Sequence, residues 1–245
     1  MRRLPGLLAA ALAVALAAPA TGADGQAPTA PRIQLIGRSV QGRPINVVRI
    51  GDPAAPRKVL VVGMIHGDEP EGRSVVDLLR RAAVPPGAEL LLVRDLNPDG
   101  LRRHTRQNAH GVDLNRNSSQ GRRFLGGPGT RFYAGPKAFS EPETRAIRAL
   151  ILATRPAVTV WYHQPFGLVD RPETGGEQIS LVYSRISGLR FHPLTPRPGS
   201  MSRWENVRVR PGSSIVVELP PGRLSAAAAQ RHAQAVLALA SAGAS

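Results

Sequence analysis

The chain of 245 residues contains no cysteine. It therefore forms no disulfide bond, and no cysteine follows the apolar N-terminal run where a lipid could be attached. Stability must come from a packed core, and a chain of this length is large enough to bury one without cross-links. We find no internal repeat and no second domain, and we predict a single domain over residues 37–245.

Aromatic residues are also scarce, at 4% of the chain. The arginines are scattered along the sequence, so neither a stacking platform nor a basic helix for nucleic acid is present. The formal charge is nevertheless +15, from 32 basic and 17 acidic residues. We predict no nucleic-acid partner, and an anionic surrounding such as a cell wall instead.

Long apolar runs are absent except at the N-terminus, where Leu7–Ala18 follows Met1-Arg2-Arg3. This run is too short to span a bilayer comfortably, and its basic start is typical of a secretory signal peptide. We predict a signal peptide over residues 1–23, with cleavage after Ala23 preferred to cleavage after Ala20, and a lead-in over residues 24–36. The mature chain would carry 15 − 2 = +13 charges and be extracytoplasmic, in the periplasm or cell wall, with no membrane association. An uncleaved membrane anchor is the alternative.

The pattern of apolar residues predicts an α/β fold. A continuous run from Val59 leads to His66 and indicates a strand buried on both faces. Ser140, with Glu143 three residues later, predicts a capping box at the start of a helix. Further strands are predicted at residues 33–36, 45–50, 89–93, 157–163 and 213–219, and helices at 72–83, 140–153 and 224–240. We expect one mixed, largely parallel twisted sheet with helices on both faces.

Polar side chains stand at the ends of three of these strands. His66 and Glu69 follow the first, and His163 ends another. Open α/β sheets bind ligands at the carboxyl ends of their strands, and imidazole and carboxylate both suit zinc. The first pair alone is also compatible with a strand end followed by a helix cap. Glu218 lies in an apolar strand, where a carboxylate is costly unless it is paired or functional.

Residues 95–117 form a polar stretch with many donor side chains and little apolar periodicity. Arg106, Asn115 and Arg116 lie within it. A guanidinium group matches a carboxylate and an amide fixes its orientation, so the stretch could hold an anionic substrate. The alternative is a solvated basic loop.

Taken in order, these motifs resemble those of the zinc metallocarboxypeptidase family. They are His66-Gly67-Asp68-Glu69, Asn97-Pro98-Asp99-Gly100, Gly111-Val112-Asp113-Leu114-Asn115-Arg116-Asn117, Phe139-Ser140-Glu141-Pro142-Glu143-Thr144, His163 and Glu218. The resemblance extends from about residue 37 to residue 223. It is greatest to the compact bacterial branch that includes murein peptide amidases.

The resemblance implies one zinc ion held by His66, Glu69 and His163. Glu218 matches the catalytic glutamate of the family. Arg106, seven residues before Asp113, matches the arginine that stabilises the developing oxyanion.

It further implies that Asn115 and Arg116 hold the free carboxylate of the substrate. Digestive members also carry a mobile tyrosine upstream of the glutamate. No tyrosine stands at that position here; Trp204 is the nearest aromatic residue, and Tyr183 is poorly spaced.

The implied function is an exported zinc peptidase or amidase that acts beside a residue with a free carboxylate. Peptidoglycan stem peptides, cleaved at the γ-D-glutamyl–diaminopimelate bond, are the preferred substrate, and the expected state is a monomer. A general metallocarboxypeptidase and an N-acyl-amino-acid deacylase are the enzymatic alternatives. A non-catalytic wall-binding protein is the third, although it would be expected to have lost one of the ligands or the glutamate.

Overall fold

The computed structural model of the chain describes residues 30–172 and 176–241. The predicted signal peptide lies outside these residues. The strands are β1 (Arg32–Arg38), β2 (Pro44–Gly51), β3 (Arg57–Val62), β4 (Ala88–Val93), β5 (Val158–His163), β6 (Leu168–Asp170), β7 (Arg190–His192) and β8 (Ser213–Glu218). The helices are α1 (Gly72–Leu79), α2 (Pro98–Arg103), α3 (Pro142–Thr154), α4 (Glu177–Ser187), α5 (Met201–Arg208) and α6 (Ala226–Ser241), with a short 3-10 helix, η1 (Leu114–Arg116).

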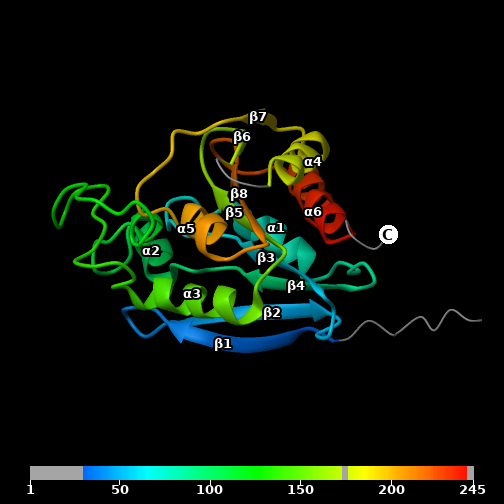
Figure 1. The fold of residues 1–245 in the computed structure, drawn as a ribbon, viewed down its shortest axis with the longest axis horizontal. Helices are drawn as coiled ribbons and strands as arrows, with labels where there is room; N and C mark the ends of the chain where they lie inside the picture. The colour runs from blue at the N-terminus through cyan, green and yellow to red at the C-terminus, as the bar shows by residue number, and fades with distance from the viewer. Residues whose placement is uncertain (1–29, 173–175, 242–245) are drawn as a thin grey trace, which may run out of the picture.

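The strands form one twisted sheet in the order β1-β2-β4-β3-β5-β8-β6-β7 (Figure 1). The central strands β4, β3, β5 and β8 run parallel to one another. β1 and β2 add antiparallel neighbours at one side, and β6 pairs antiparallel with β8 at the other. The predicted mixed, largely parallel sheet is therefore confirmed. β1 extends across the boundary predicted at residue 37 and belongs to the sheet.

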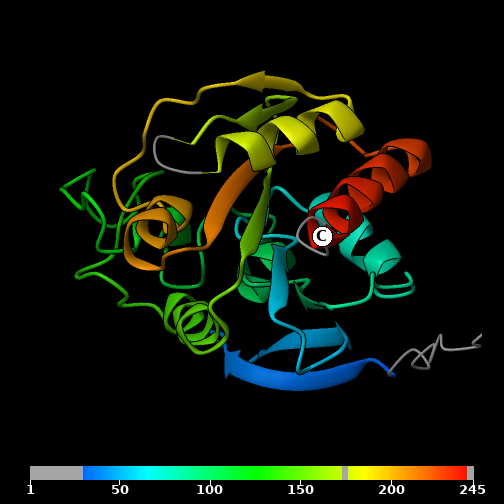
Figure 2. The same cartoon turned by 45° about the vertical axis from the view of Figure 1, so that its right-hand side comes forward.

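Helices cover both faces of the sheet (Figures 1 and 2). One apolar cluster packs α1, α4 and α6 against one face, and a second packs α3 and α5 against the other. Every residue of β4 and β5 is buried, as expected for strands covered on both sides. Within the described residues, no helix has the length and apolar character needed to cross a bilayer.

The strand predicted to run to His66 ends four residues earlier, at Val62. Beyond it the backbone still bonds to the end of β4, through Gly63 N to Val93 O, and to the segment after β4, through Leu96 N to Met64 O. It then turns at Gly67, where a Cβ atom would lie 1.9 Å from the carbonyl carbon of Gly100. Only glycine permits this close approach to α2. His66 is therefore presented from a turn.

The predicted capping box at the start of α3 is wrong. The N-cap is Glu141, and it has no side-chain cap hydrogen bond. Ser140 Oγ instead donates to Glu141 Oε1 at 2.6 Å and accepts from Asn117 Nδ2 at 2.9 Å. The carboxylate of Glu143 accepts hydrogen bonds from Val40 N and Asn108 Nδ2, both at 3.0 Å. The two side chains serve tertiary contacts that join α3 to the polar loops and to the turn after β1.

Glu205 links α5 to β5, the strand that ends in His163. Its two carboxylate oxygens accept hydrogen bonds from Thr159 Oγ1 at 2.5 Å and Trp161 Nε1 at 3.3 Å. The side chain is buried, and burial raises the pKa of its carboxyl to about 7. The folded protein therefore binds this proton more tightly than the unfolded chain does.

This difference predicts a pH-dependent effect of Glu205→Gln on stability. A raised pKa contributes stability that is fully present below the ordinary glutamate range and is lost as pH rises through about 7. Glutamine keeps the shape and does not titrate. Relative to the unmodified protein, the variant should gain on the order of 1–3 kcal/mol in the free energy of unfolding between pH 4 and pH 8. Urea denaturation at both pH values measures this gain. Glu177→Gln, at an exposed site, is the control, and an equal effect of Glu205→Gln at both pH values would contradict the assignment.

Candidate metal centre and substrate cavity

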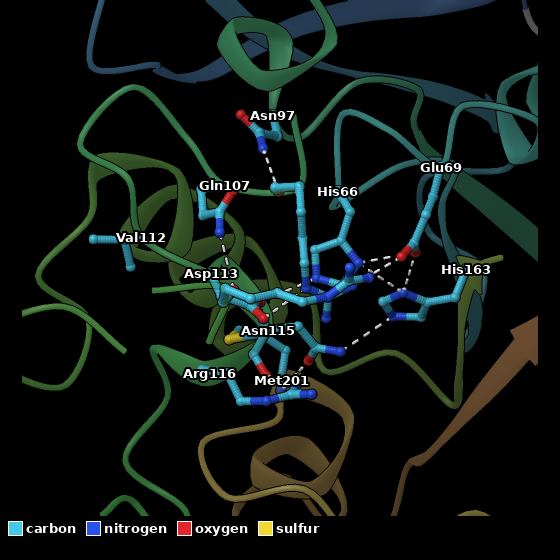
Figure 3. Close-up of polar contacts among 12 residues, drawn as sticks. His66, Glu69, Asn97, Gln107, Val112, Asp113, Asn115, Arg116, His163 and Met201 are labelled. Carbon is cyan, nitrogen blue, oxygen red and sulfur yellow. Dashed lines mark hydrogen bonds and ion pairs between the residues drawn. The ribbon is translucent and has the colours of Figure 1, made fainter. Parts of the chain in front are cut away.

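Three buried side chains converge on one space, two from the turn after β3 and one from the end of β5 (Figure 3). Oε2 of Glu69 lies 2.9 Å from Nδ1 of His66 and 2.9 Å from Nδ1 of His163. The two imidazole nitrogens are 3.2 Å apart. β3 and β5 are parallel neighbours, so their carboxyl ends bring the turn with His66 beside His163.

The chemistry of this donor set fits a divalent zinc ion. The three ligand atoms all lie within 4.8 Å of one another, and zinc binds imidazole nitrogen and carboxylate oxygen at about 2.0–2.2 Å. A single proton can bridge only two of these three atoms, whereas a cation can bind both nitrogens and the carboxylate oxygen at once. Three protein ligands also leave a coordination position open, as hydrolytic zinc sites require.

A second ring of contacts fixes the orientation of these ligands. Nε2 of His66 lies 3.1 Å from Oδ1 of Asp113, so its proton is directed to that carboxylate and the lone pair of Nδ1 to the centre. Arg106 donates from Nε to Asp113 Oδ2 and from Nη1 to Glu69 Oε1, both at 2.9 Å. Burial alone would raise the pKa of Asp113, but His66 and Arg106 hold it well below its usual range. Asp113 is therefore a carboxylate at neutral pH.

Asn115 and Arg116 belong to η1, which lies next to the candidate metal centre (Figure 3). Asn115 Nδ2 is 3.2 Å from Nε2 of His163, and its Oδ1 accepts a hydrogen bond from Met201 N at 2.9 Å. The side chain of Arg116 is largely buried and donates from Nη1 to the carbonyl of Asn115 at 2.6 Å. The Asp113 side chain caps this turn by accepting from Asn115 N.

Glu218 completes the group from the adjacent strand. It is paired by register with His163 across β5 and β8. Its Oε2 atom is buried and has no hydrogen-bond partner in residues 30–172 and 176–241. Burial raises the pKa of this carboxyl, an effect that His163 partly offsets. A buried carboxylate oxygen without a partner is costly and indicates a role toward a ligand or water.

All seven residues predicted for the site line one cavity of about 220 Å³. They are His66, Glu69, Arg106, Asn115, Arg116, His163 and Glu218. The cavity also contains residues that the sequence did not single out, from the loop before α3, from the segment before α5 and from α5 itself: Arg131, Phe132, Arg197, Arg203 and Asn206. They lack a local pattern because they meet only in the folded chain.

Neither aromatic residue considered in place of the mobile tyrosine reaches this cavity. Tyr183 is fully buried in the core and shares hydrogen bonds with Tyr162 Oη at 2.6 Å and His232 Nδ1 at 2.8 Å. Trp204 is buried against Phe139, with the ring centroids 5.3 Å apart. Both residues have structural roles.

Comparison with known proteins gives the family. The zinc carboxypeptidase family matches residues 22–169, which is more than half of the chain and includes His66, Glu69 and His163. The chain belongs to the zinc carboxypeptidase family. It is accordingly a hydrolase, and the His–Glu–His group described above is the site for the family's metal. Glu218 lies beyond the matched segment, so its role rests on its position in the cavity and on the motif order.

Relatives and solved structures agree with this assignment. Murein peptide amidase A of Escherichia coli (strain K12) is 32% identical over 190 residues, which cover 71% of this chain and 76% of the relative. The crystal structure of the murein-tripeptide amidase from Escherichia coli O157 superposes with a TM-score of 0.66 at 27% identity, over 85% of this chain and 91% of that one. Carboxypeptidase A from Helicoverpa armigera, at 20% identity, shares the fold with a TM-score of 0.73 over 88% and 69% of the two chains.

The role of Asp113 can be tested by Asp113→Asn. The amide cannot accept the His66 proton and pair with Arg106 as the carboxylate does, so the zinc dissociation constant should rise about 10- to 100-fold. Competition with a chromophoric chelator measures it. Asp95→Asn is a matched control, because Asp95 also pairs with arginines, Arg73 and Arg94, outside the cavity. Equal zinc affinity in Asp113→Asn and the unmodified protein would refute the role.

Proposed function

We propose that this protein is an exported zinc-dependent amidase that cleaves peptidoglycan stem peptides beside a residue with a free carboxylate. The preferred bond is the γ-D-glutamyl–diaminopimelate link. The observation that carries the proposal is the shared cavity, where three candidate zinc ligands lie beside a buried carboxyl, Glu218, and a buried guanidinium, Arg116. The relatives named murein amidases support the substrate class.

The side chains divide the chemistry between them. When bound, a single zinc ion held by His66, Glu69 and His163 would polarise the scissile carbonyl and acidify the attacking water. Glu218 accepts the proton of that water and passes it to the leaving amine nitrogen. Its raised pKa suits both steps. The fixed charge of Arg106 stabilises the oxyanion that develops at the carbonyl.

Substrate binding depends on the carboxylate of the leaving residue. Arg116 presents a guanidinium group to the cavity, and Asn115 lies between Arg116 and His163. Together they hold the carboxylate of the leaving residue at a fixed distance from the metal centre. This placement aligns the amide bond with Glu218.

The charge of the cavity supports an anionic stem peptide over an ordinary one. Six arginines and three carboxylates line it: Arg106, Arg116, Arg131, Arg171, Arg197 and Arg203, against Glu69, Asp170 and Glu218. One free carboxylate on the substrate needs one guanidinium. A glutamate linked through its γ-carboxyl keeps its α-carboxyl free, and diaminopimelate carries two carboxyls, so a stem peptide matches the surplus positive charge.

Export is part of the proposal and rests on the sequence alone. The basic start and short apolar run of residues 1–23 support a secretory signal. The high positive charge suits the anionic cell wall. We propose that the mature chain acts there as a monomer.

A substrate panel tests the proposed function. The zinc-loaded protein is given L-Ala-γ-D-Glu-diaminopimelate, peptides with C-terminal lysine or phenylalanine, and an N-acetyl amino acid. Mass spectrometry of the products should show release of diaminopimelate, with a kcat/KM at least about tenfold above that for any other substrate, since several guanidinium contacts distinguish it. An intact stem peptide, or faster cleavage of an ordinary peptide or of the N-acetyl amino acid, would refute the assignment.

Glu218→Gln tests the proton transfer. Glutamine keeps the size of the side chain and cannot take a proton from water, so kcat should fall about 10²- to 10⁴-fold. Zinc content should stay unchanged, because Glu218 is outside the ligand group. Steady-state kinetics together with metal analysis measures both quantities. Undiminished turnover in a zinc-replete variant would show that another group acts as the base.

A further inference from the structure

Phe132 lies at the meeting point of three arginines in the cavity. The guanidinium carbons of Arg106, Arg116 and Arg131 lie 5.6, 5.4 and 5.8 Å from the centre of its ring. Arg106 and Arg116 come from different parts of the polar stretch after β4, and Phe132 comes from the loop before α3. One aromatic ring therefore contacts both arginines that the proposed mechanism uses.

Apolar packing does not explain the position of the Phe132 ring. Phe132 is 39% exposed and belongs to neither of the two apolar clusters. It lines the cavity together with the arginines it contacts. The negative face of an aromatic ring attracts a guanidinium group within about 6 Å, and all three distances are within that range.

The two mechanistic arginines differ in how they are held. Arg106 is fixed by ion pairs with Glu69 and Asp113. Arg116 has one hydrogen bond to a carbonyl, from Nη1 to Asn115 O, and no carboxylate within 4.0 Å in the described residues. Burial, together with the charges of Arg106 and Arg197, lowers the pKa of Arg116, although Asp113 opposes the shift.

The surroundings of Arg116 therefore disfavour its positive charge. A partner that stabilises this charge without occupying the hydrogen-bond donors of the guanidinium group would leave Arg116 able to bind the substrate. A carboxylate partner would occupy the guanidinium and compete with the substrate. An aromatic ring stabilises the cation and leaves its hydrogen-bond donors available. The free substrate carboxylate can then bind to a guanidinium group that is already oriented.

We propose that Phe132 is a positioning residue that orients the Arg116 guanidinium toward the carboxylate of the substrate. This inference rests on the proposed function, because it assumes that Arg116 receives a carboxylate. It assigns to the loop before α3 a part in recognition that no sequence motif marks.

The test compares Phe132→Leu with Phe132→Tyr in the zinc-loaded protein. Leucine keeps an apolar side chain and loses the ring, whereas tyrosine keeps the ring face. Phe124→Leu is the matched control, because Phe124 is 84% exposed and does not line the cavity. Circular dichroism and thermal denaturation confirm that each variant folds.

The first readout is binding of N-acetylglycine, a minimal carboxylate ligand, with N-acetylglycinamide as the uncharged counterpart. Phe132→Leu should weaken N-acetylglycine binding about 3- to 30-fold and leave the amide unaffected, whereas Phe132→Tyr and Phe124→Leu should stay within about twofold of the parent. In an Arg116→Gln background, Phe132→Leu should add less than about twofold, because the group it orients is gone. For the stem peptide, Phe132→Leu should raise KM more than it lowers kcat.

Three results would overturn the proposal. They are equal weakening by Phe132→Leu in both backgrounds, a tyrosine variant that behaves as the leucine variant does, and no preference of the parent protein for N-acetylglycine over its amide. Because the binding readout requires no turnover, it tests the positioning role of Phe132 separately from the proposed amidase function. Carboxylate binding that depends on Phe132 without cleavage of the stem peptide would refute the proposed function alone.

Discussion

The convergence of His66, Glu69 and His163 on one buried space is the constraint on which the rest of the site depends. Two imidazoles and a carboxylate within about 3 Å of one another are costly to bury unless a cation joins them. The parallel pairing of β3 with β5 brings the two histidines together. The next parallel pair, β5 with β8, brings Glu218 to the same edge. The sheet thus supplies His163 and the proposed base from strand ends, and it places the turn with His66 and Glu69 beside them.

Loops supply the groups that face the substrate, and ionic contacts attach them to this rigid edge. The Asp113 carboxylate accepts hydrogen bonds from both the His66 ring and the Arg106 guanidinium group. The same residue caps the turn that carries Asn115 and Arg116. A single carboxylate therefore joins the metal ligands to the carboxylate-binding pair. A change in the position of this loop would move the metal ligands and the substrate groups together.

The sequence predicted most of the strands because their apolar runs are continuous. Polar residues at the ends of those runs indicated His66, Glu69, His163 and Glu218, whereas the roles of Arg106, Asn115 and Arg116 came from the resemblance to the family. It did not predict the turn that presents His66, because the reason for it is a contact between Gly67 and Gly100 far apart in the chain. Ser140 and Glu143 matched a local capping pattern, yet both side chains bond to residues distant in the chain, Ser140 to Asn117 and Glu143 to Val40. The helices α2, α4 and α5 were not predicted. The cluster around Phe132 was also missed, because three separate segments build it.

A zinc-edge anomalous difference map from crystals of the zinc-loaded protein tests the central claim most directly. The account predicts one strong peak within about 2.0–2.2 Å of His66 Nδ1, His163 Nδ1 and a carboxylate oxygen of Glu69. A peak at any other position, or a peak that lacks either imidazole, would contradict it.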